Sequence, residues 1–403
     1  MRTLLSGPAL LDPYPFFAEM RAQHPVVLDE PAACWSVYRH ADVSAALSDH
    51  DRFPQSLLEP GEMPDAATRR FASLIAFDPP RHTRMRNLAM RAFTASAVAR
   101  LEGRITAIVD ERLDAVAATG RTELIADLAG PLPATVIAEM LGVPVADLAT
   151  FRRWSDAVGE AATAIVSDPV GGAPRMVAAF EPIEDYLRQT IAERRRQPAD
   201  DLVSRLIAAQ IDGEALDELD LVAFCVLLLI AGNSTTTHLI GNAILALLRH
   251  PAEAARLTAR PELVPQAIEE LLRYDSPVIA MMRRVRRDCE LGGQRLQAGQ
   301  RVMLWTGAAN RDPAAFPDPD RLDLERKPGH HIAFGHGPHY CLGAPLARLE
   351  ARVALPAILR RLPELALADH AALAPVPGYF MRGVVALPLR FRPATIAIAG
   401  RSQ

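Results

Sequence analysis

The chain has 403 residues, of which 50% are hydrophobic and 23% are charged. This balance is typical of a soluble globular protein with a sizeable core, and it excludes a disordered or fibrous chain. Because 44 basic and 48 acidic residues give a net charge of −4, the bulk electrostatics do not suggest binding to nucleic acid or to a membrane surface.

The spacing of the cysteines and the N-terminal sequence indicate the cellular compartment of the protein. The four cysteines are widely scattered and none has the CxxC spacing of a zinc site, so we expect neither zinc nor disulfides. Residues 1–25 contain charges and prolines and lack the apolar stretch of a signal peptide or anchor. The longest apolar run, 221–231, has 11 residues, whereas a membrane span needs about 20. We therefore expect a cytoplasmic protein without a membrane segment.

The first half of the chain is patterned mostly for helices. No linker or repeat divides the sequence, so we predict one domain over residues 1–403, mainly α with small β-sheets. A short strand is expected at 34–38 and an irregular loop at 55–66. The helical patterns lie at 81–118, 131–141 and 175–195. The sequence PVGGAP at 169–174 is expected to interrupt the helical pattern.

The second half begins with one long helical pattern over 217–249. Acids at its start and a basic end followed by Pro251 are helix start and stop signals. A helix of this length would span about 50 Å at 1.5 Å per residue. Being so long and so apolar, it should run through the middle of a large domain. After it we expect a helix at 261–274, short strands within 278–306, a loop-like stretch at 310–340 and a last helix at 342–361.

The densest motif, FGHGPHYCLG at 334–343, comes directly before the last helix. A helix N-terminus would stabilise a thiolate at Cys341, and the glycines would let the backbone come close to a bulky partner. This is a good place to hold a soft metal ion by one sulfur. Considered alone, however, such a cysteine is more often a buried structural residue beside a Gly-rich turn.

This string resembles the haem-binding loop of the cytochrome P450 family. The matching residues are Phe334, Gly335, Gly337, His339, Cys341 and Gly343. The resemblance covers nearly the whole chain and implies a single-domain cytochrome P450 fold with a long central helix over the haem. It also implies haem b (iron protoporphyrin IX) as the cofactor and Cys341 as the iron ligand. Thiolate ligation favours cleavage of the O–O bond.

A second motif of the family, E-x-x-R, is present as Glu270 and Arg273. Residues at i and i+3 share a helix face and can form an ion pair. On its own the pattern could be a surface salt bridge worth less than about 1 kcal/mol. The resemblance implies a buried structural pair, completed by Arg321, that holds the loop before the cysteine.

His82 and Arg86 are four residues apart and therefore point the same way from a helix. The resemblance implies that this pair reaches a haem propionate, which needs cationic partners. His339 and Arg283 resemble the remaining propionate contacts. The alternative for His82 and Arg86 is a solvated basic helix face.

The long central helix carries AGNSTTT at 231–237. The resemblance implies that Ala231 and Gly232 lie beside the haem, that Gly232 leaves room for oxygen, and that an acid and Thr235 deliver protons. Ser234 occupies the position of the acid. A serine can pass a proton on through water but cannot supply one as a carboxyl group does. The catalytic candidates are thus Gly232, Ser234 and Thr235, although Ser and Thr within helices also often bond back to carbonyls one turn earlier.

The function implied by the resemblance is a monooxygenase that inserts one atom of O2 into a small, largely apolar molecule. No flavin or Rossmann fingerprint occurs in the sequence, so the electrons must come from a separate ferredoxin or flavodoxin with its reductase. We expect this partner to dock on a face formed by Arg84, Arg91, Arg348 and Arg352, and the protein to be a monomer that binds no nucleic acid.

Two alternatives remain open because of Ser234. One is an enzyme that uses peroxide or catalyses oxidative coupling, and the other is a haem-binding sensor or carrier without turnover. The expected walls of the substrate pocket are the ranges 55–77, 151–183, 225–232, 278–282 and 379–381.

Overall fold

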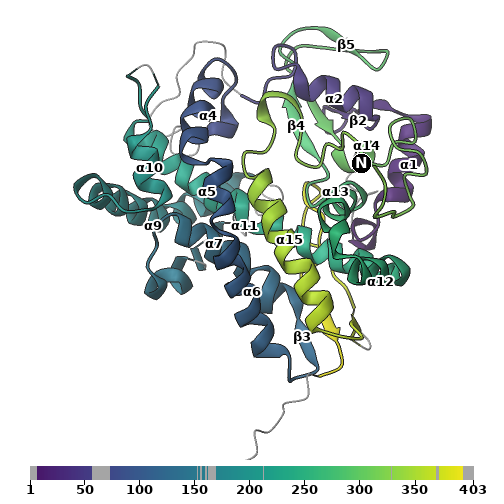
Figure 1. Cartoon of the computed structure of the whole chain (residues 1–403). Helices are drawn as coiled ribbons and strands as arrows, with labels where there is room; N and C mark the ends of the chain where they lie inside the picture. Colours follow the sequence, from purple (N-terminus) through teal and green to yellow (C-terminus); the bar gives the residue numbers. More distant parts are fainter. Residues whose placement is uncertain are drawn as a thin grey trace, which may run out of the picture.

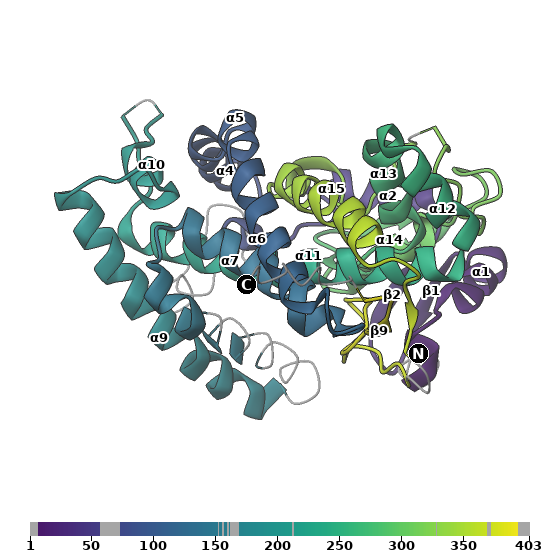
Figure 2. The same ribbon diagram turned by 60° about the horizontal axis from the view of Figure 1, so that its bottom comes forward.

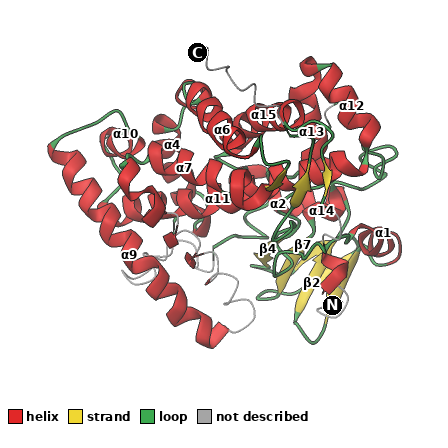
Figure 3. Cartoon of the chain, turned by 90° about the horizontal axis from the view of Figure 1, so that it is seen from below, coloured by secondary structure: helices red, strands yellow, loops and turns green. Residues whose placement is uncertain are grey.

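The computed structural model describes residues 7–393 except 57–72, 152, 155–156, 159–160, 162–168, 212, 328 and 369–371. Helices make up most of this part of the chain, and the strands gather toward one side (Figure 3). The helices in chain order are α1 (Tyr14–Gln23), α2 (His40–Ser48), α4 (Arg81–Ala92), α5 (Ala95–Ala99), α6 (Glu102–Val116), α7 (Pro131–Met140), α9 (Pro169–Arg196), α10 (Leu202–Ala208), α11 (Glu218–Arg249), α12 (Pro251–Ala259), α13 (Val264–Tyr274), α14 (Thr306–Ala309) and α15 (Ala344–Arg361). The prediction of a mainly α protein with small sheets is confirmed.

Three small sheets accompany the helices. The largest has the strand order β1–β2–β7–β4, in which only β2 and β7 are parallel. A second sheet has the order β3–β9–β8, and β5 and β6 form a hairpin. The strands are β1 (Val26–Asp29), β2 (Cys34–Val37), β3 (Arg121–Glu123), β4 (Met281–Arg284), β5 (Cys289–Leu291), β6 (Gln294–Leu296), β7 (Arg301–Leu304), β8 (Ala366–Leu367) and β9 (Pro388–Arg390). The strands expected at 34–38 and within 278–306 are therefore present.

Helix α11 passes through the middle of the molecule (Figure 2). It begins where the Asp217 side chain accepts a hydrogen bond from the amide of Asp220 at 2.9 Å, which caps the first turn. It packs against α7, α9, α13 and α15, and α15 lies over it near the centre of Figure 1. Among the described helices, α11 is the one long and apolar enough to cross a membrane. In this fold its apolar side chains go into the protein core, where residues 239–247 are buried at every position.

Two expected helices differ in their bounds. The pattern at 81–118 forms three helices, because Thr94 adopts an extended backbone and caps α5 by accepting a hydrogen bond from Ala97. The segment 169–174 does not interrupt the helix: α9 starts at Pro169. A proline costs little in the first turn, where amides have no intrahelical partner, and Pro174 removes one bond soon after it. Most of the loop expected at 55–66 lies outside the described residues.

Candidate active site

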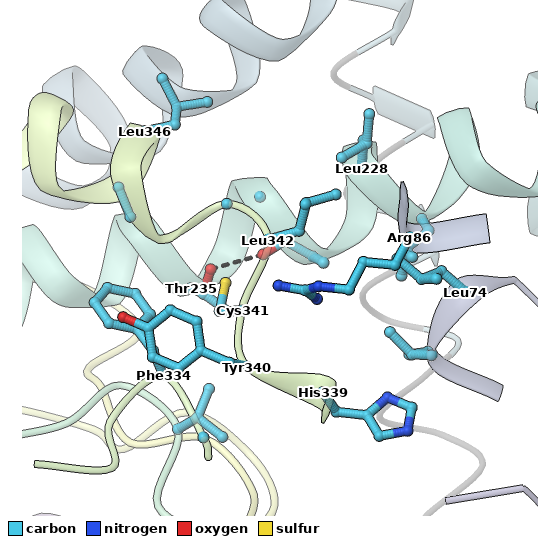
Figure 4. Close-up of a pocket in the computed structure, with 18 of the residues that line it drawn as sticks. Leu74, Arg86, Leu228, Thr235, Phe334, His339, Tyr340, Cys341, Leu342 and Leu346 are labelled. Carbon is cyan, nitrogen blue, oxygen red and sulfur yellow. Dashed lines mark hydrogen bonds between the residues drawn. The ribbon is translucent and has the colours of Figure 1, made fainter. Parts of the chain in front are cut away.

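A cavity of about 430 Å³ lies between α11, α4, β4 and the loop that leads into α15 (Figure 4). Most of its surface is apolar. Its apolar walls include Leu74, Ile137, Leu228, Val278 and Met282. Cys341 and Thr235 both line it, although they are far apart in sequence.

The loop before α15 places Cys341 at the cavity wall. Its amide donates a hydrogen bond to the carbonyl of Phe334 at 2.9 Å, which closes the loop on itself. The sulfur accepts hydrogen bonds from the amides of Gly343 and Ala344, as expected at a helix N-terminus. Burial nevertheless outweighs these bonds and raises the pKa of the Cys341 thiol. A bound cation is therefore needed to keep this sulfur a thiolate at neutral pH.

Two glycines in this loop are required by the backbone. Gly335 and Gly337 have φ angles of +75° and +72°, in the left-handed region that favours glycine. At Gly337 a Cβ would also lie 2.8 Å from the backbone of Leu47 and Ser48. The motif therefore reflects the close approach of the loop to α2.

Two histidines lie on one side of the cavity. The rings of His82 and His339 have their centroids 4.1 Å apart, and His339 Nε2 lies 3.3 Å from Asp78 Oδ1. His82 Nδ1 is buried and makes no hydrogen bond within the described part of the chain. Burial, together with the charges of His339 and Arg86, lowers the pKa of His82 to about 4.

Two arginines complete this group of side chains. Arg86 extends toward Cys341 (Figure 4), and burial lowers the pKa of its guanidinium. Arg283 donates hydrogen bonds to Gln55 and to the carbonyl of Met282. Burial lowers the pKa of Arg283 to about 10. Both guanidinium groups are buried without a full set of anionic partners. A negatively charged ligand in the cavity would therefore stabilise them.

Two more residues belong to this cluster: Gln55, which lies within the expected pocket wall 55–77, and Asp78, which was not predicted. Asp78 accepts hydrogen bonds from the amides of Gln55 and Ser56 at 3.0 and 2.9 Å. Although burial acts to raise it, the pKa of Asp78 is lowered by these bonds and by the bond from His339. Its position four residues before His82 in the same motif was the available signal.

Helix α11 forms another wall of the cavity. Ala231, Gly232, Thr235 and Thr236 line the cavity. The Thr235 hydroxyl donates a hydrogen bond back to the carbonyl of Ala231 at 2.6 Å, so the alternative considered for this residue is realised. Ser234 is exposed and does not belong to the described lining of the cavity.

The E-x-x-R pair is buried, as predicted. Glu270 and Arg273 are 3% and 2% exposed, and two hydrogen bonds of 2.7 and 2.8 Å join them. The predicted third member is wrong: the side chain that reaches Glu270 is Arg326, at 3.1 Å, and not Arg321. The Arg321 side chain is 66% exposed. Only its carbonyl turns inward, where it accepts from Arg273 at 3.4 Å.

The predicted docking arginines do not form one set of free charges. Arg348 donates to both oxygens of Glu269 at 2.6 and 2.7 Å, and its guanidinium lies over the Phe334 ring. Arg84 forms an exposed ion pair with Glu214 at 3.1 Å. Arg91 and Arg352 are exposed and have no ion pair with any residue that the structure describes.

Two of the expected pocket walls are absent from this cavity. Of the described residues that line it, none comes from 151–183 or 379–381. Part of the first range lies outside the described residues.

Comparisons with known proteins identify the fold. The family model "Cytochrome P450" matches residues 173–364. The chain is 43% identical over 345 residues to the cyclomarin C epoxidase of Salinispora arenicola, covering 85% of this chain and 87% of the epoxidase. It is 40% identical to the vitamin D(3) 25-hydroxylase of Pseudonocardia autotrophica, covering 91% and 90%. A Bacillus megaterium cytochrome P450 solved with corticosterone has a TM-score of 0.85 at 37% identity, covering 95% and 99%.

Members of this family bind haem b, and the residues of the cavity fit it. Cys341 offers a single sulfur that accepts hydrogen bonds from two amides at a helix N-terminus, and a bound metal cation would compensate the cost of burying it as the thiolate that ligates a metal. The cationic side chains of Arg86 and Arg283, together with the buried His82 Nδ1 that has no partner among the described residues, suit the two carboxylates of a porphyrin. Identity over most of the chain, the shared fold and this fit agree: the chain belongs to the cytochrome P450 family of haem-binding oxidoreductases.

Proposed function

We propose that the protein is a monooxygenase that uses O2 and externally supplied electrons to oxidise a small, largely apolar molecule. The observation that carries this proposal is that Cys341 and Thr235 line the same, largely apolar cavity. The haem, when bound, supplies the activation of oxygen, which a thiolate ligand promotes.

In this proposal the residues of the cavity divide into two roles. Cys341 ligates the iron, while Phe334, Gly335 and Gly343 shape the loop around the sulfur. The side chains that hold the propionates are His82, Arg86, Arg283 and His339.

The α11 wall would control oxygen and protons. Ala231 and Gly232 line the cavity without bulky side chains, and Thr235 can exchange its bond to the Ala231 carbonyl for one to a group inside the cavity. Ser234 has no carboxyl to offer and lies outside the described cavity wall.

The chemistry of the cavity favours an uncharged substrate. Apart from the side chains assigned to the propionates and the polar Gln55, Thr235 and Thr236, the described lining is mostly aliphatic or aromatic. A charged substrate would lose its hydration there without a partner. The relatives named for vitamin D(3) and solved with corticosterone handle molecules with this character.

We also propose that electrons arrive from a small acidic ferredoxin or flavodoxin with its reductase. Arg91 and Arg352 are the predicted docking residues that remain exposed and free of ion pairs in the described structure. Exposed Met90 and Tyr340 add apolar contact area beside Arg91 and Cys341. We further propose a cytoplasmic monomer made of one domain.

The test is a titration of apolar compounds against the haem-loaded protein, followed by turnover with a surrogate reductase. A ligand that displaces iron-bound water shifts the absorption spectrum, and a substrate then gives an oxygenated product as NADPH is consumed. Product formed with peroxide alone would favour the peroxide-using alternative. Spectral binding without product under either condition would favour a sensor or carrier.

A further inference from the structure

Asp78 is a buried carboxylate at which three segments of the chain meet. It lies just before α4, and its side chain is 7% exposed. It accepts hydrogen bonds from the amides of Gln55 and Ser56 at 3.0 and 2.9 Å, and His339 Nε2 lies 3.3 Å from its Oδ1. One side chain therefore joins the segment after α2, the start of α4 and the loop that carries the cysteine.

The described polar contacts of this carboxyl group are all with hydrogen-bond donors. Besides the two amides and His339, Arg286 Nη2 lies 3.7 Å from Asp78 Oδ2. Burial acts to raise the pKa of Asp78, but the bonds from His339 and the two amides outweigh it and lower the pKa. Asp78 is therefore a carboxylate at neutral pH, which only accepts, so His339 Nε2 carries the proton in this contact. An amide of the same shape would turn an N–H group toward at least one of these donors.

Asp78 is also connected to the other polar side chains of the cavity. Its backbone carbonyl accepts a hydrogen bond from the His82 amide at 3.0 Å, at the start of α4. Gln55, whose amide Asp78 holds, accepts a hydrogen bond from Arg283 through its side-chain oxygen. Asp78 therefore contacts His82 and His339 directly and reaches Arg283 through Gln55.

We infer that Asp78 is a positioning residue for the haem carboxylates, because its side chain holds the His339 ring and the Gln55–Arg283 contact in place to bind them. The inference rests on the proposed assignment of His82, Arg86, Arg283 and His339 to the propionates. Asp78 does not belong to the described lining of the cavity, so it acts through these side chains. Donors that are held in place beforehand lose less conformational entropy when they bind an anion.

The first test measures how fast the ferric haem-loaded protein loses its haem to an excess of apomyoglobin, followed by absorbance. Asparagine has almost the size of aspartate but cannot accept from all these donors at once, so Asp78→Asn should transfer haem about 10-fold faster or more. Asp127→Asn is the matched control. Asp127 accepts from the Thr122 hydroxyl and the Glu123 amide at 2.7 and 2.8 Å and does not belong to the described cavity lining. Its variant should transfer haem at the wild-type rate.

Haem dimethyl ester separates positioning from general structural damage. Its carboxyl groups are methylated and uncharged, so the side chains that Asp78 holds have no anion to bind. Wild type should therefore lose the ester faster than haem, and Asp78→Asn should lose the ester at the same rate as wild type.

The rates with the two cofactors decide the role of Asp78. If Asp78→Asn transfers haem as slowly as wild type, the inference is overturned and the assignment of the four side chains to the propionates stands. The same rise with haem and with the ester would show a general structural role and would also overturn the inference. A wild type that holds haem and its ester equally well would overturn the assignment and the inference together.

Gln55→Met provides the test if Asp78→Asn does not fold. Methionine keeps the length of the side chain and leaves the backbone amide for Asp78, but it offers Arg283 no oxygen acceptor. Haem transfer from Gln55→Met should be faster than from wild type, and loss of the ester should be unchanged. In that case, an unchanged haem rate or an equal rise with both cofactors would overturn the inference.

The vibrations of the haem carboxylates give a readout that does not depend on cofactor loss. The propionate-bending bands in the resonance Raman spectrum shift when the hydrogen bonds to the carboxylates change. These bands should shift in haem-loaded Asp78→Asn and stay at their wild-type positions in Asp127→Asn. Unshifted bands in Asp78→Asn would contradict the inference.

Discussion

Gly232 on α11 lies directly against Ile137 on α7: a Cβ at position 232 would stand 2.2 Å from Ile137 Cδ1. The family resemblance led us to expect that this glycine leaves room for oxygen. The structure supplies a separate requirement, because α7 and α11 pack at this point. Helix packing therefore places the end of the Ile137 side chain against position 232 whether or not oxygen is bound.

Replacing Gly232 with Ala should change the free energy of unfolding by about 1 kcal/mol or less. The new Cβ meets only the end of the flexible Ile137 side chain, so the cost of moving that methyl group is close to the gain in helix propensity. Denaturant unfolding of Gly232→Ala, and of the double variant with Ile137→Val that lacks this methyl group, measures the two effects. A loss of several kcal/mol in the single variant would mean that Ile137 cannot move aside.

Replacing Cys341 with Ala should abolish the thiolate spectrum of the reduced carbon monoxide complex. Among the described cysteines, Cys341 is the one that lines the cavity. Cys225, which burial keeps as a thiol by raising its pKa to about 12, provides the matched control. Its replacement by Ala should leave the spectrum unchanged. Survival of the thiolate spectrum in Cys341→Ala would require another ligand.

Replacing Arg273 with Ala should give insoluble or haem-free protein, because Glu270 would remain as a buried charge at a cost of about 3 to 5 kcal/mol. Arg326→Ala should have a smaller effect in the same direction, since Arg326 binds Glu270 at 3.1 Å. The exposed Arg321 offers the control: Arg321→Ala should have normal haem content and stability. Loss of haem from Arg321→Ala with none from Arg326→Ala would contradict the structural assignment.

Neutralising Arg91 or Arg352 should weaken binding of an acidic redox partner, and salt should weaken binding to the wild type in the same way. Arg348→Gln should instead affect stability or haem content, because Arg348 is bound to Glu269 and stacked on Phe334. Partner affinity measured over a range of ionic strengths distinguishes these effects. Unchanged affinity in both Arg91 and Arg352 variants would place the partner on another face.

Ser234→Asp introduces an acid beside Thr235 and should raise the rate of NADPH consumption, while Thr235→Ala should divert more electrons to peroxide. Product per NADPH and released peroxide are measured for wild type and both variants. Tight coupling in the wild type together with no gain in Ser234→Asp would contradict this prediction and show that protons reach the cavity by another route.

Local signals were sufficient for most elements of the fold. The acidic start and basic end of α11 predicted its bounds to within one residue. Dipole and capping preferences depend on the residues at and next to the helix ends, so they can be recognised in the sequence. The break at Thr94 between α4 and α5 was missed, because the residues on both sides of it have helix-forming periodicity.

The sequence by itself determined which residues lie close together where they are separated by only a few positions. The glycines and Cys341 of the haem loop, the Glu270–Arg273 pair and the His82–Arg86 pair all lie within one loop or one helical turn. Over so few residues the backbone geometry allows few relative positions of the side chains. Their proximity could therefore be predicted before the fold was known.

Only the tertiary structure decided which distant side chains meet. Arg326 rather than Arg321 reaches Glu270, and Arg348 is bound by Glu269. Glu350, which is buried on α15, forms a hydrogen bond with Thr236 on α11. Each of these contacts joins a helix to a segment dozens of residues away, and which side chain turns inward depends on packing in three dimensions. Burial is a property of that packing as well, and it is burial that makes Glu350 a protonated acid where the sequence shows an ordinary glutamate.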